Sequence, residues 1–285
     1  MGVRARAVGV TAPVHLTLGD WGVQISGPES AATTLATVLA GLRVYGETPA
    51  AFEIAISPDL GSATGSVEMR PLWTIALPSS GWLGTLVGHT IATLATLLTR
   101  LLFVHAGAVS VDGRGCVVIG ESGAGKTSLI ASLTRLGARY VSDDLALLDP
   151  GAGTIVPVTV PLAVKVWTAR AAGTLPPGRE VASEGGTRYW LPDAVAAGPV
   201  PAAEFVFLRP GGRVPRTRAL TRAGALLALA RHTSSFAHRH RVEDAFIGFA
   251  RILTAAQCLA VESRSPAAFA PAMLARLRAA SPQGH

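Results

Sequence analysis

Lysine is nearly absent from this chain of 285 residues. Lys and Arg together number 25 against 18 acidic residues, which gives a formal net charge of +7. All of these basic residues are Arg except Lys126 and Lys165. The excess positive charge is therefore best interpreted as scattered surface Arg, and a site that requires a compact ammonium group has two candidates.

Cysteine, aromatic residues and long hydrophobic runs are also scarce. Cys116 and Cys258 have no metal-ligand spacing and indicate a reduced, cytoplasmic protein. Aromatic residues form 6% of the chain, which does not support a base-stacking platform for a nucleic acid. The most apolar stretch, residues 81–104, contains His89, Arg100 and five Thr, and the first ten residues lack the apolar core of a signal peptide. We therefore expect neither a membrane nor a nucleic acid as a partner.

Residues 1–86 are expected to form a small accessory portion of α+β type. Alternating apolar residues on both sides of Gly19-Asp20 predict two strands and a tight turn within residues 3–26. Further elements are predicted as a helix over Glu29–Leu42 and as strands over Phe52–Ile56 and Leu72–Leu77. This portion shows no cluster of chemical groups in its sequence, which favours a scaffold or a partner surface.

Residues 87–285 are predicted to form an α/β domain in which helices flank a mixed sheet. In the first half of this domain, Asp112-Gly113 predicts a hairpin turn and Gly137 predicts the end of a helix. The predicted helices cover Leu86–Arg100, Lys126–Leu136, Leu220–Ala230, Val242–Gln257 and Pro266–Ala279. The predicted strands cover Val104–Val111, Gly115–Ile119, Arg139–Val141, Leu162–Trp167, Phe205–Leu208 and Cys258–Glu262.

The segment GESGAGKTS matches the phosphate-binding pattern G-x-x-x-x-G-K-[ST]. Glycines let its backbone turn several N–H groups inward, and the helix that follows adds its positive end. Lys126 offers a point charge to the outer phosphates, and Thr127 offers a hydroxyl to Mg²⁺. We therefore expect a nucleotide to bind here. The candidate binding residues are Gly120, Glu121, Ser122, Gly123, Ala124, Gly125, Lys126, Thr127 and Ser128.

Two adjacent acids, Asp143 and Asp144, follow the next predicted strand. Phosphoryl transfer needs Mg²⁺ to neutralise charge and a carboxylate that orients the nucleophile and takes its proton. Because neighbouring residues on a strand point to opposite faces, we expect the two acids to have separate roles. His105 begins the strand pair before the loop, so the hairpin would bring it close, although spacing alone favours a structural role for it.

The stretch from His105 to Asp144 resembles the catalytic core of the HPr kinase/phosphorylase family. It also resembles the shorter HPr-kinase-related proteins of peptide-modification gene clusters, including lasso-peptide kinases. The histidine, the glycine-rich loop, the helix that ends in glycine and the Asp-Asp pair carry the resemblance. It implies a P-loop kinase core of the HPr kinase type that uses ATP and Mg²⁺. Glu121 stands where the family usually has Asp, and the family's later Arg-Gly-Leu-Gly segment has no counterpart, so a kinase without phosphorylase activity is expected.

The resemblance also implies a role for each site residue. The loop would hold the β- and γ-phosphates, and Thr127 would bind Mg²⁺ together with Asp144. Asp143 would be the base that faces the acceptor hydroxyl, with the reverse assignment of the two acids left open. His105 would orient that carboxylate or touch the transferred group. The family is often oligomeric, so a homo-oligomer is a further expectation.

The second lysine and the remaining polar segments have weaker assignments. Lys165 falls in a predicted strand, where a charge is disfavoured unless it is used, so a role at the nucleotide or acceptor competes with a surface position. The Arg-rich stretches 209–222 and 238–241 would either bind an acidic group or form a solvated face. Arg188–Trp190, which follows Gly185-Gly186, is a candidate segment for acceptor recognition.

These patterns favour an ATP-dependent kinase that phosphorylates a Ser or Thr hydroxyl of a peptide or small protein, including a natural-product precursor peptide. A kinase for a free small molecule, such as an amino acid or a sugar, also fits, and a deep closed pocket would favour it. A nucleotide-binding regulatory protein that does no transfer is the third hypothesis. It would lack a carboxylate beside the γ-phosphate.

Overall fold

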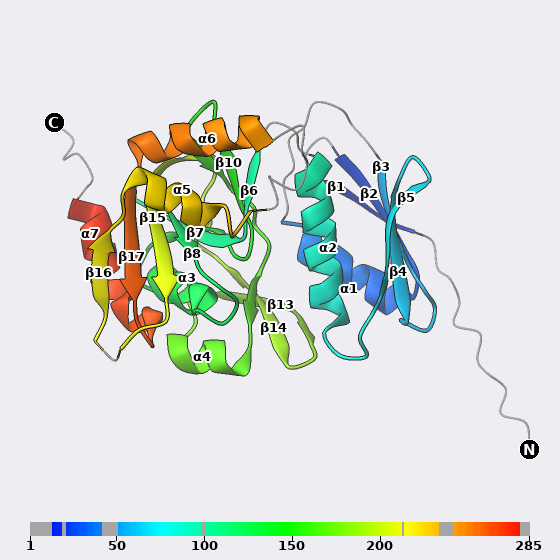
Figure 1. The fold of residues 1–285 in the computed structure, drawn as a ribbon. Coiled ribbons are helices and arrows are strands. Elements are labelled where there is room, and N and C mark those ends of the chain that lie inside the picture. Colours follow the sequence, from blue (N-terminus) through cyan, green and yellow to red (C-terminus); the bar gives the residue numbers. More distant parts are fainter. Residues whose placement is uncertain are drawn as a thin grey trace, which may run out of the picture.

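The computed structural model describes residues 13–18, 21–41, 51–97, 101–212, 214–233 and 242–279. These residues form a mixed α/β protein that is built around three sheets. Figure 1 shows the N-terminal sheet and its two helices beside a larger part that holds the other sheets. The predictions for residues 3–12, 19–20, 42, 98–100, 213 and 238–241 lie outside the described residues. Every helix in the described part of the chain is too short or too polar to span a lipid bilayer.

The N-terminal sheet has the strand order β1-β2-β3-β4-β5. Its strands are β1 (Val14–Leu18), β2 (Trp21–Ser26), β3 (Ala51–Ile56), β4 (Ser62–Val67) and β5 (Arg70–Ala76), and its helices are α1 (Glu29–Leu39) and α2 (Trp82–Leu97). The predicted strands and the α1 helix are confirmed. The sequence did not predict β4, because its residues SATGSV are small and mostly polar. The predicted division between residues 86 and 87 falls within α2.

The large sheet is mixed, as predicted. Its order is β6-β10-β11-β15-β8-β7-β9, with β17 beside β15 and β16 beside β17. The strands are β6 (Leu102–Val104), β7 (Ala106–Val111), β8 (Arg114–Ile119), β9 (Arg139–Ser142), β10 (Ala146–Asp149), β11 (Thr154–Val156), β15 (Val200–Arg209), β16 (Arg216–Ala219) and β17 (Gln257–Glu262). Strand β15 runs parallel to β8 and β17. Asp112 and Gly113 both have positive φ at the β7–β8 turn, which confirms the hairpin.

Helices cover both faces of the large sheet (Figure 1). They are α3 (Lys126–Arg135), α5 (Arg222–Leu229), α6 (Val242–Ala255) and α7 (Ala270–Ala279). One hydrophobic core joins the sheet to α5 and α6, and a second joins it to α3 and α7. Helix α3 begins at Lys126, and Gly137 follows its end with φ +106°, as predicted. The predicted last helix begins as a 3₁₀ turn over Pro266–Phe269.

The third sheet corrects one prediction. It contains β12 (Leu162–Val164), β13 (Gly178–Glu184) and β14 (Thr187–Pro192) in the order β12-β14-β13. The strand predicted over Leu162–Trp167 ends at Val164, because Val164 lies opposite Arg188, one residue from the start of its antiparallel partner β14. Lys165 is therefore not in a strand. It occupies the cap position before a short helix, α4 (Val166–Ala172).

The N-terminal part shares a hydrophobic core with the larger part. Val158, Val160 and Tyr189 of the larger part belong to the same buried cluster as the apolar faces of α1 and α2. The carboxylate of Glu184 accepts the N–H of Gly81, just before α2, at 2.8 Å. These contacts hold α2 against β13 and β14, so the accessory portion has a fixed place beside the larger part.

The buried carboxylate of Glu204 on β15 depends on one cation. Glu204 is 1% exposed, and Arg276 of α7 donates to it at 2.8 Å. Removing one partner of a buried ion pair leaves the other charge uncompensated. Arg276→Ala should therefore lower the free energy of unfolding by about 2–4 kcal/mol in urea titrations. Arg278→Ala, at an exposed position two residues further along α7, is the control, and an equal effect of both changes would contradict this role of the pair.

Candidate functional site

The glycine-rich loop joins the end of β8 to the start of α3. Gly123 and Gly125 have φ of +80° and +93°, a left-handed conformation that favours glycine. Gly125 is the cap residue of α3 and has no side chain, so it offers no side-chain cap to the first amides of the helix. A Cβ at Gly125 would also lie 3.0 Å from the ring of Pro266. The loop thus presents backbone N–H groups at a helix N-terminus, which is an anion-binding geometry.

The Lys126 ammonium is held inside this loop. It donates to the Gly120 carbonyl at 2.9 Å and lies 3.2 Å from Nε2 of His105. The residue is 5% exposed, and burial lowers the pKa of its ammonium, while the charges of Asp144 and Asp143 oppose that shift. A phosphate entering the loop would meet a cation that is already positioned by the loop's own backbone.

The Thr127 hydroxyl contacts Asp143 rather than Asp144. Its oxygen donates to the two carboxylate oxygens of Asp143 at 3.0 and 3.2 Å. This geometry departs from the pairing of Thr127 with Asp144 that the resemblance implied for the metal. Asp143 follows β9, is 3% exposed, and has its carboxylate beside Gly107 of β7.

The pair of Thr127 and Asp143 fits a divalent cation such as Mg²⁺. Burial, followed by the charge of Asp144, raises the pKa of the Asp143 carboxyl to about 8. Mg²⁺ prefers oxygen ligands and is commonly held by one or two carboxylates together with phosphate oxygens and water. The described residues contain no cluster of three or more His, Cys, Asp or Glu side chains that could hold a metal alone. A cation at this pair would therefore take further oxygens from a bound nucleotide.

The raised pKa of Asp143 has a consequence for stability. Between the unfolded pKa of about 4 and the folded pKa of about 8, the folded protein holds a proton that the unfolded chain releases, so the free energy of unfolding falls as pH rises. Asp143→Asn has no such proton. Without Mg²⁺, we expect the stability of Asp143→Asn relative to the wild type to increase as the pH rises through this window. Urea titrations at pH 5 and pH 8 measure the difference in stability between the two proteins, and an unchanged difference would contradict the assigned pKa.

Asp144 has an exposed side chain and a left-handed backbone, with φ +60°. Its carbonyl oxygen lies 3.1 Å from Nδ1 of His105. Because a carbonyl only accepts, Nδ1 carries the proton, and Nε2 accepts from the Lys126 ammonium. Burial and the nearby Lys126 charge lower the pKa of His105, which favours this neutral form. His105 thus connects the main chain of Asp144 to Lys126. The resemblance implied that it orients a carboxylate or touches the transferred group.

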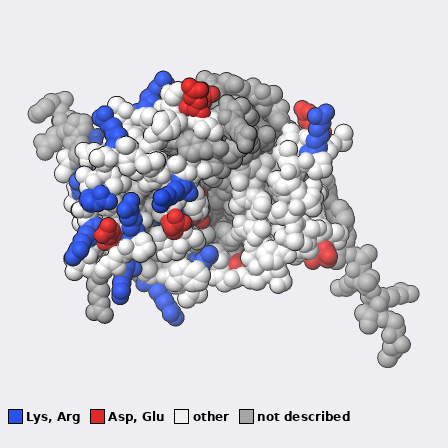
Figure 2. All heavy atoms as spheres, viewed as in Figure 1, with Lys and Arg blue, Asp and Glu red and all other residues white. Residues whose placement is uncertain are grey.

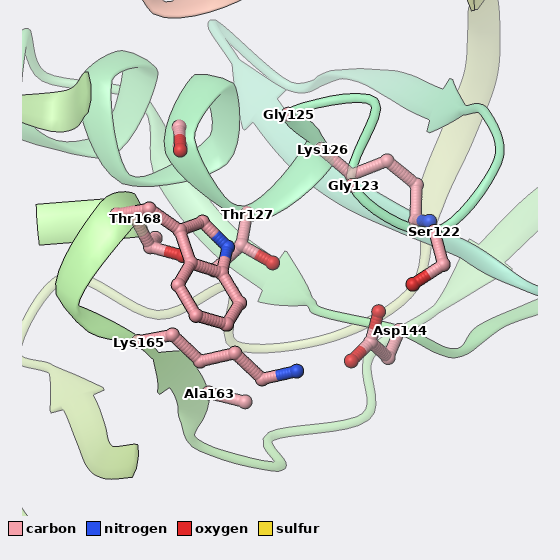
Figure 3. Close-up of a pocket in the computed structure, with 11 residues that line it drawn as sticks. Ser122, Gly123, Gly125, Lys126, Thr127, Asp144, Ala163, Lys165 and Thr168 are labelled. Atoms are coloured by element: carbon pink, nitrogen blue, oxygen red, sulfur yellow. The ribbon is translucent and has the colours of Figure 1, made fainter. Parts of the chain in front are cut away.

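A pocket of about 100 Å³ lies against the loop (Figure 3). Of the predicted binding residues, Ser122, Gly123, Gly125, Lys126, Thr127, Ser128 and Lys165 line it, and Asp144 joins them. Figure 3 shows the Lys165 ammonium pointing toward Asp144 across this pocket. Lys165 also lies 5.3 Å from the ring centre of Trp167, an exposed residue that lines the same pocket. Sequence reasoning missed Trp167 because it placed this residue in a strand.

A second cavity, of about 340 Å³, borders both acids. Its walls come from α2, β6, β12 and β14, together with His105, Asp143 and Asp144. Sequence reasoning missed the α2 wall, although Gly84, Gly88 and Ala92 recur every four residues along one helix face, which is a readable signal. Tyr189, within the predicted recognition segment, also lines the cavity.

The Arg-rich stretch 209–222 begins next to the glycine-rich loop, because Leu208 lies against Gly120. Its described arginines line neither the loop pocket nor the second cavity, and those of β16 are exposed. On the face drawn in Figure 2, Lys and Arg gather over the larger part, whereas the N-terminal part is mostly uncharged. The exposed arginines of β16 agree with a solvated face for that part of the stretch.

Comparisons with known proteins add little to this geometry. No protein-family model matches the chain, and no curated protein matches it. Among solved structures, the chain is similar to the Hpr(Ser) kinase/phosphatase from Coxiella burnetii, with 13% sequence identity and a TM-score of 0.32. The match covers 63% of this chain and 99% of that one. A likeness at this TM-score supports no conclusion about function, so any functional proposal must rest on the residues of this chain.

Proposed function

We propose that the protein is an ATP-dependent kinase that transfers a γ-phosphoryl group to a hydroxyl. The observation that carries this proposal is the position of Asp144, which borders both the pocket at the glycine-rich loop and the second cavity. A protein that only binds a nucleotide needs no carboxylate between its phosphate site and a second ligand-sized space. A kinase needs one there, because the acceptor hydroxyl must lose its proton beside the γ-phosphate.

The nucleotide side of the proposed reaction uses the loop and α3. Backbone N–H groups from Gly120 to Thr127 and the Lys126 ammonium would bind the β- and γ-phosphates. Thr127 and Asp143 would hold Mg²⁺, which when bound neutralises charge on the phosphates. Lys165 would add positive charge at the wall of the same pocket. The interaction of each of these groups with the transferred phosphoryl group becomes stronger as negative charge spreads over that group.

The acceptor side of the proposed reaction uses Asp144. Its carboxylate would take the proton of the acceptor hydroxyl while that oxygen forms a bond to the γ-phosphorus. The bond from this phosphorus to the oxygen bridging the β- and γ-phosphates breaks, and ADP leaves with that oxygen. The contact between Thr127 and Asp143 supports the reverse of the assignment that the resemblance implied, with Asp143 at the cation and Asp144 as the base.

Two classes of acceptor remain within this proposal. A Ser or Thr of a peptide or small protein was the first expectation from sequence, and a free small molecule was the second. The described arginines of the stretch 209–222 line neither space, which removes one reason to expect an acidic peptide. A cavity of about 340 Å³ is near the lower end of the roughly 300–1,000 Å³ typical of ligand pockets, which favours a small molecule or a short peptide segment over a folded protein surface.

The cation pair gives a direct test. Thr127→Val removes the hydroxyl beside Asp143, so one oxygen ligand of the cation is lost. The affinity for ATP in the presence of Mg²⁺ should then fall by roughly tenfold or more, and most of the increase that Mg²⁺ causes should disappear. Titration calorimetry with and without Mg²⁺ measures this. Thr134→Val is the matched control: it removes a buried hydroxyl of the same helix that donates to its own Ile130 carbonyl. We expect the control to keep the Mg²⁺ effect. Equal Mg²⁺ dependence in Thr127→Val and wild type would contradict the cation site.

A further inference from the structure

We propose that the second cavity, which we call the α2 cavity, binds the acceptor and selects an uncharged alcohol with an apolar body. The inference deepens the proposed kinase function and rests on it for the transfer step. Binding in the α2 cavity is measurable without transfer, so the two proposals can fail separately.

The lining of the α2 cavity is mostly apolar, and its polar part includes Asp143 and Asp144. Val87 and Ile91 of α2 face Phe103, Val160 and Ala163 across the cavity. Such walls exclude water and stabilise a ligand through burial of apolar surface, by roughly 25 cal/mol per Å². Polar groups in the lining are few, and the carboxyl groups of Asp143 and Asp144 are among them. A ligand with an apolar body would therefore place its hydroxyl toward the acids.

The charge of the cavity excludes acidic acceptors. Among the described residues that line it, none is Lys or Arg, while two are Asp. A carboxylate or phosphate on the acceptor would lose its hydration against this lining, which offers it no Lys or Arg side chain. Hydroxy acids and sugar phosphates are therefore poor candidates. An uncharged alcohol meets no such penalty, whether it is a free molecule or a Ser side chain between apolar residues.

Helix α2 forms one wall of the cavity, and its glycines add no side chain that would fill the space. Gly84 and Gly88 face the cavity, and a Cβ built at Gly88 has no atom within 4 Å. A larger residue at Gly88 would project into open space without disturbing the packing of the helix. The contact of Glu184 with Gly81 fixes the start of this helix. The N-terminal part thus supplies a wall of the acceptor site, beyond the scaffold role that its sequence suggested.

Gly88→Leu is the variant that tests the cavity. Its side chain should fill the space, and leucine raises helix propensity relative to glycine, so the fold should be kept. Gly88→Ala adds one methyl group and leaves most of the volume. Gly22→Leu adds the same side chain on β2, where a Cβ also has no atom within 4 Å, and it is the control far from the site. Thermal unfolding of each variant confirms that the fold is intact.

The probes are 2-phenylethanol and 3-phenyllactate, which share a ring and a hydroxyl but differ in a carboxylate. Their binding to the full chain is measured by ligand-observed NMR with Mg²⁺ and a non-hydrolysable ATP analogue present. We expect the wild type to bind 2-phenylethanol at least ten times more tightly than 3-phenyllactate. Gly88→Leu should lose at least tenfold in affinity for 2-phenylethanol, whereas Gly88→Ala and Gly22→Leu should stay within about threefold of the wild type.

The source of the alcohol is distinguished with γ-labelled ATP. The peptide acetyl-Leu-Ser-Leu-amide and 2-phenylethanol are tested as separate acceptors, and labelling of either one that Gly88→Leu suppresses supports the proposal. Three results would overturn it: no binding of 2-phenylethanol to the wild type, equal binding of 3-phenyllactate, or wild-type binding by Gly88→Leu. Failure of Mg·ATP to bind to the protein would instead contradict the kinase function. The affinity of the cavity for the two probes would still be measured in that case.

Discussion

Lys126→Met should lower phosphoryl transfer by roughly a thousandfold at saturating ATP. The ammonium is buried in the glycine-rich loop, where its donors face the Gly120 carbonyl and His105. When a nucleotide binds, the same donors would turn to phosphate oxygens whose charge grows in the transition state. Methionine keeps an unbranched apolar side chain of similar length and removes the ammonium with its charge and its donors. Transfer is measured with γ-labelled ATP, and the affinity for ATP is measured separately by calorimetry.

Two comparisons separate the role of Lys126 from a general effect of charge. Lys126→Arg keeps the charge but should also fail, because a planar guanidinium is larger than the ammonium that the loop encloses at 5% exposure. Lys165→Met removes the other lysine, whose side chain is exposed, and should cost less than Lys126→Met. Transfer within threefold of the wild type in Lys126→Met would contradict the assigned phosphate site.

Asp144→Asn should lower kcat by roughly 10²–10⁴-fold while Mg·ATP still binds. Asparagine tolerates the left-handed backbone that Asp144 adopts, so the change removes the proton acceptor without adding strain. The pocket and the α2 cavity both border this residue, which is why its loss should affect chemistry more than binding. Single-turnover measurement of transfer, together with calorimetry of Mg·ATP binding, distinguishes the two effects.

Asp143→Asn is the matched comparison for the base. Asp143 contacts Thr127, so its replacement should weaken the dependence of ATP binding on Mg²⁺, an effect that Asp144→Asn should not produce. If Asp143→Asn kept its Mg²⁺ dependence and Asp144→Asn lost it, the two acids would have the roles that the resemblance first implied. Full transfer by both variants would remove the carboxylates from the reaction.

The local part of the site was predictable from sequence because it is contiguous. The pattern from Gly120 to Thr127 requires a turn and a helix start, and the structure has left-handed glycines and a helix that begins at Lys126. Asp143 and Asp144 follow one short strand, so their closeness to the loop needs only a single strand–helix–strand unit. The separate roles of the two acids were not predictable, because they depend on which carboxylate points toward Thr127.

The acceptor side was not predictable, because its residues come from distant segments. Helix α2 reaches the acids only through the core that it shares with Tyr189 and Val160, and no local pattern encodes that docking. The strand expected through Lys165 failed for a related reason: whether an apolar run stays in a strand depends on whether a partner strand continues beside it. Local periodicity predicted the elements of the N-terminal part except β4, but the position of α2 beside the acids required the assembled structure.

A crystal structure of the full chain with Mg²⁺ and a non-hydrolysable ATP analogue tests the central claim most directly. We predict that the terminal phosphate lies against Lys126 and that the cation binds Thr127 and Asp143. The far side of that phosphate should face Asp144 and the α2 cavity, in line for attack by an acceptor hydroxyl. A terminal phosphate that points away from Asp144, or a triphosphate bound outside the glycine-rich loop, would contradict the proposed kinase.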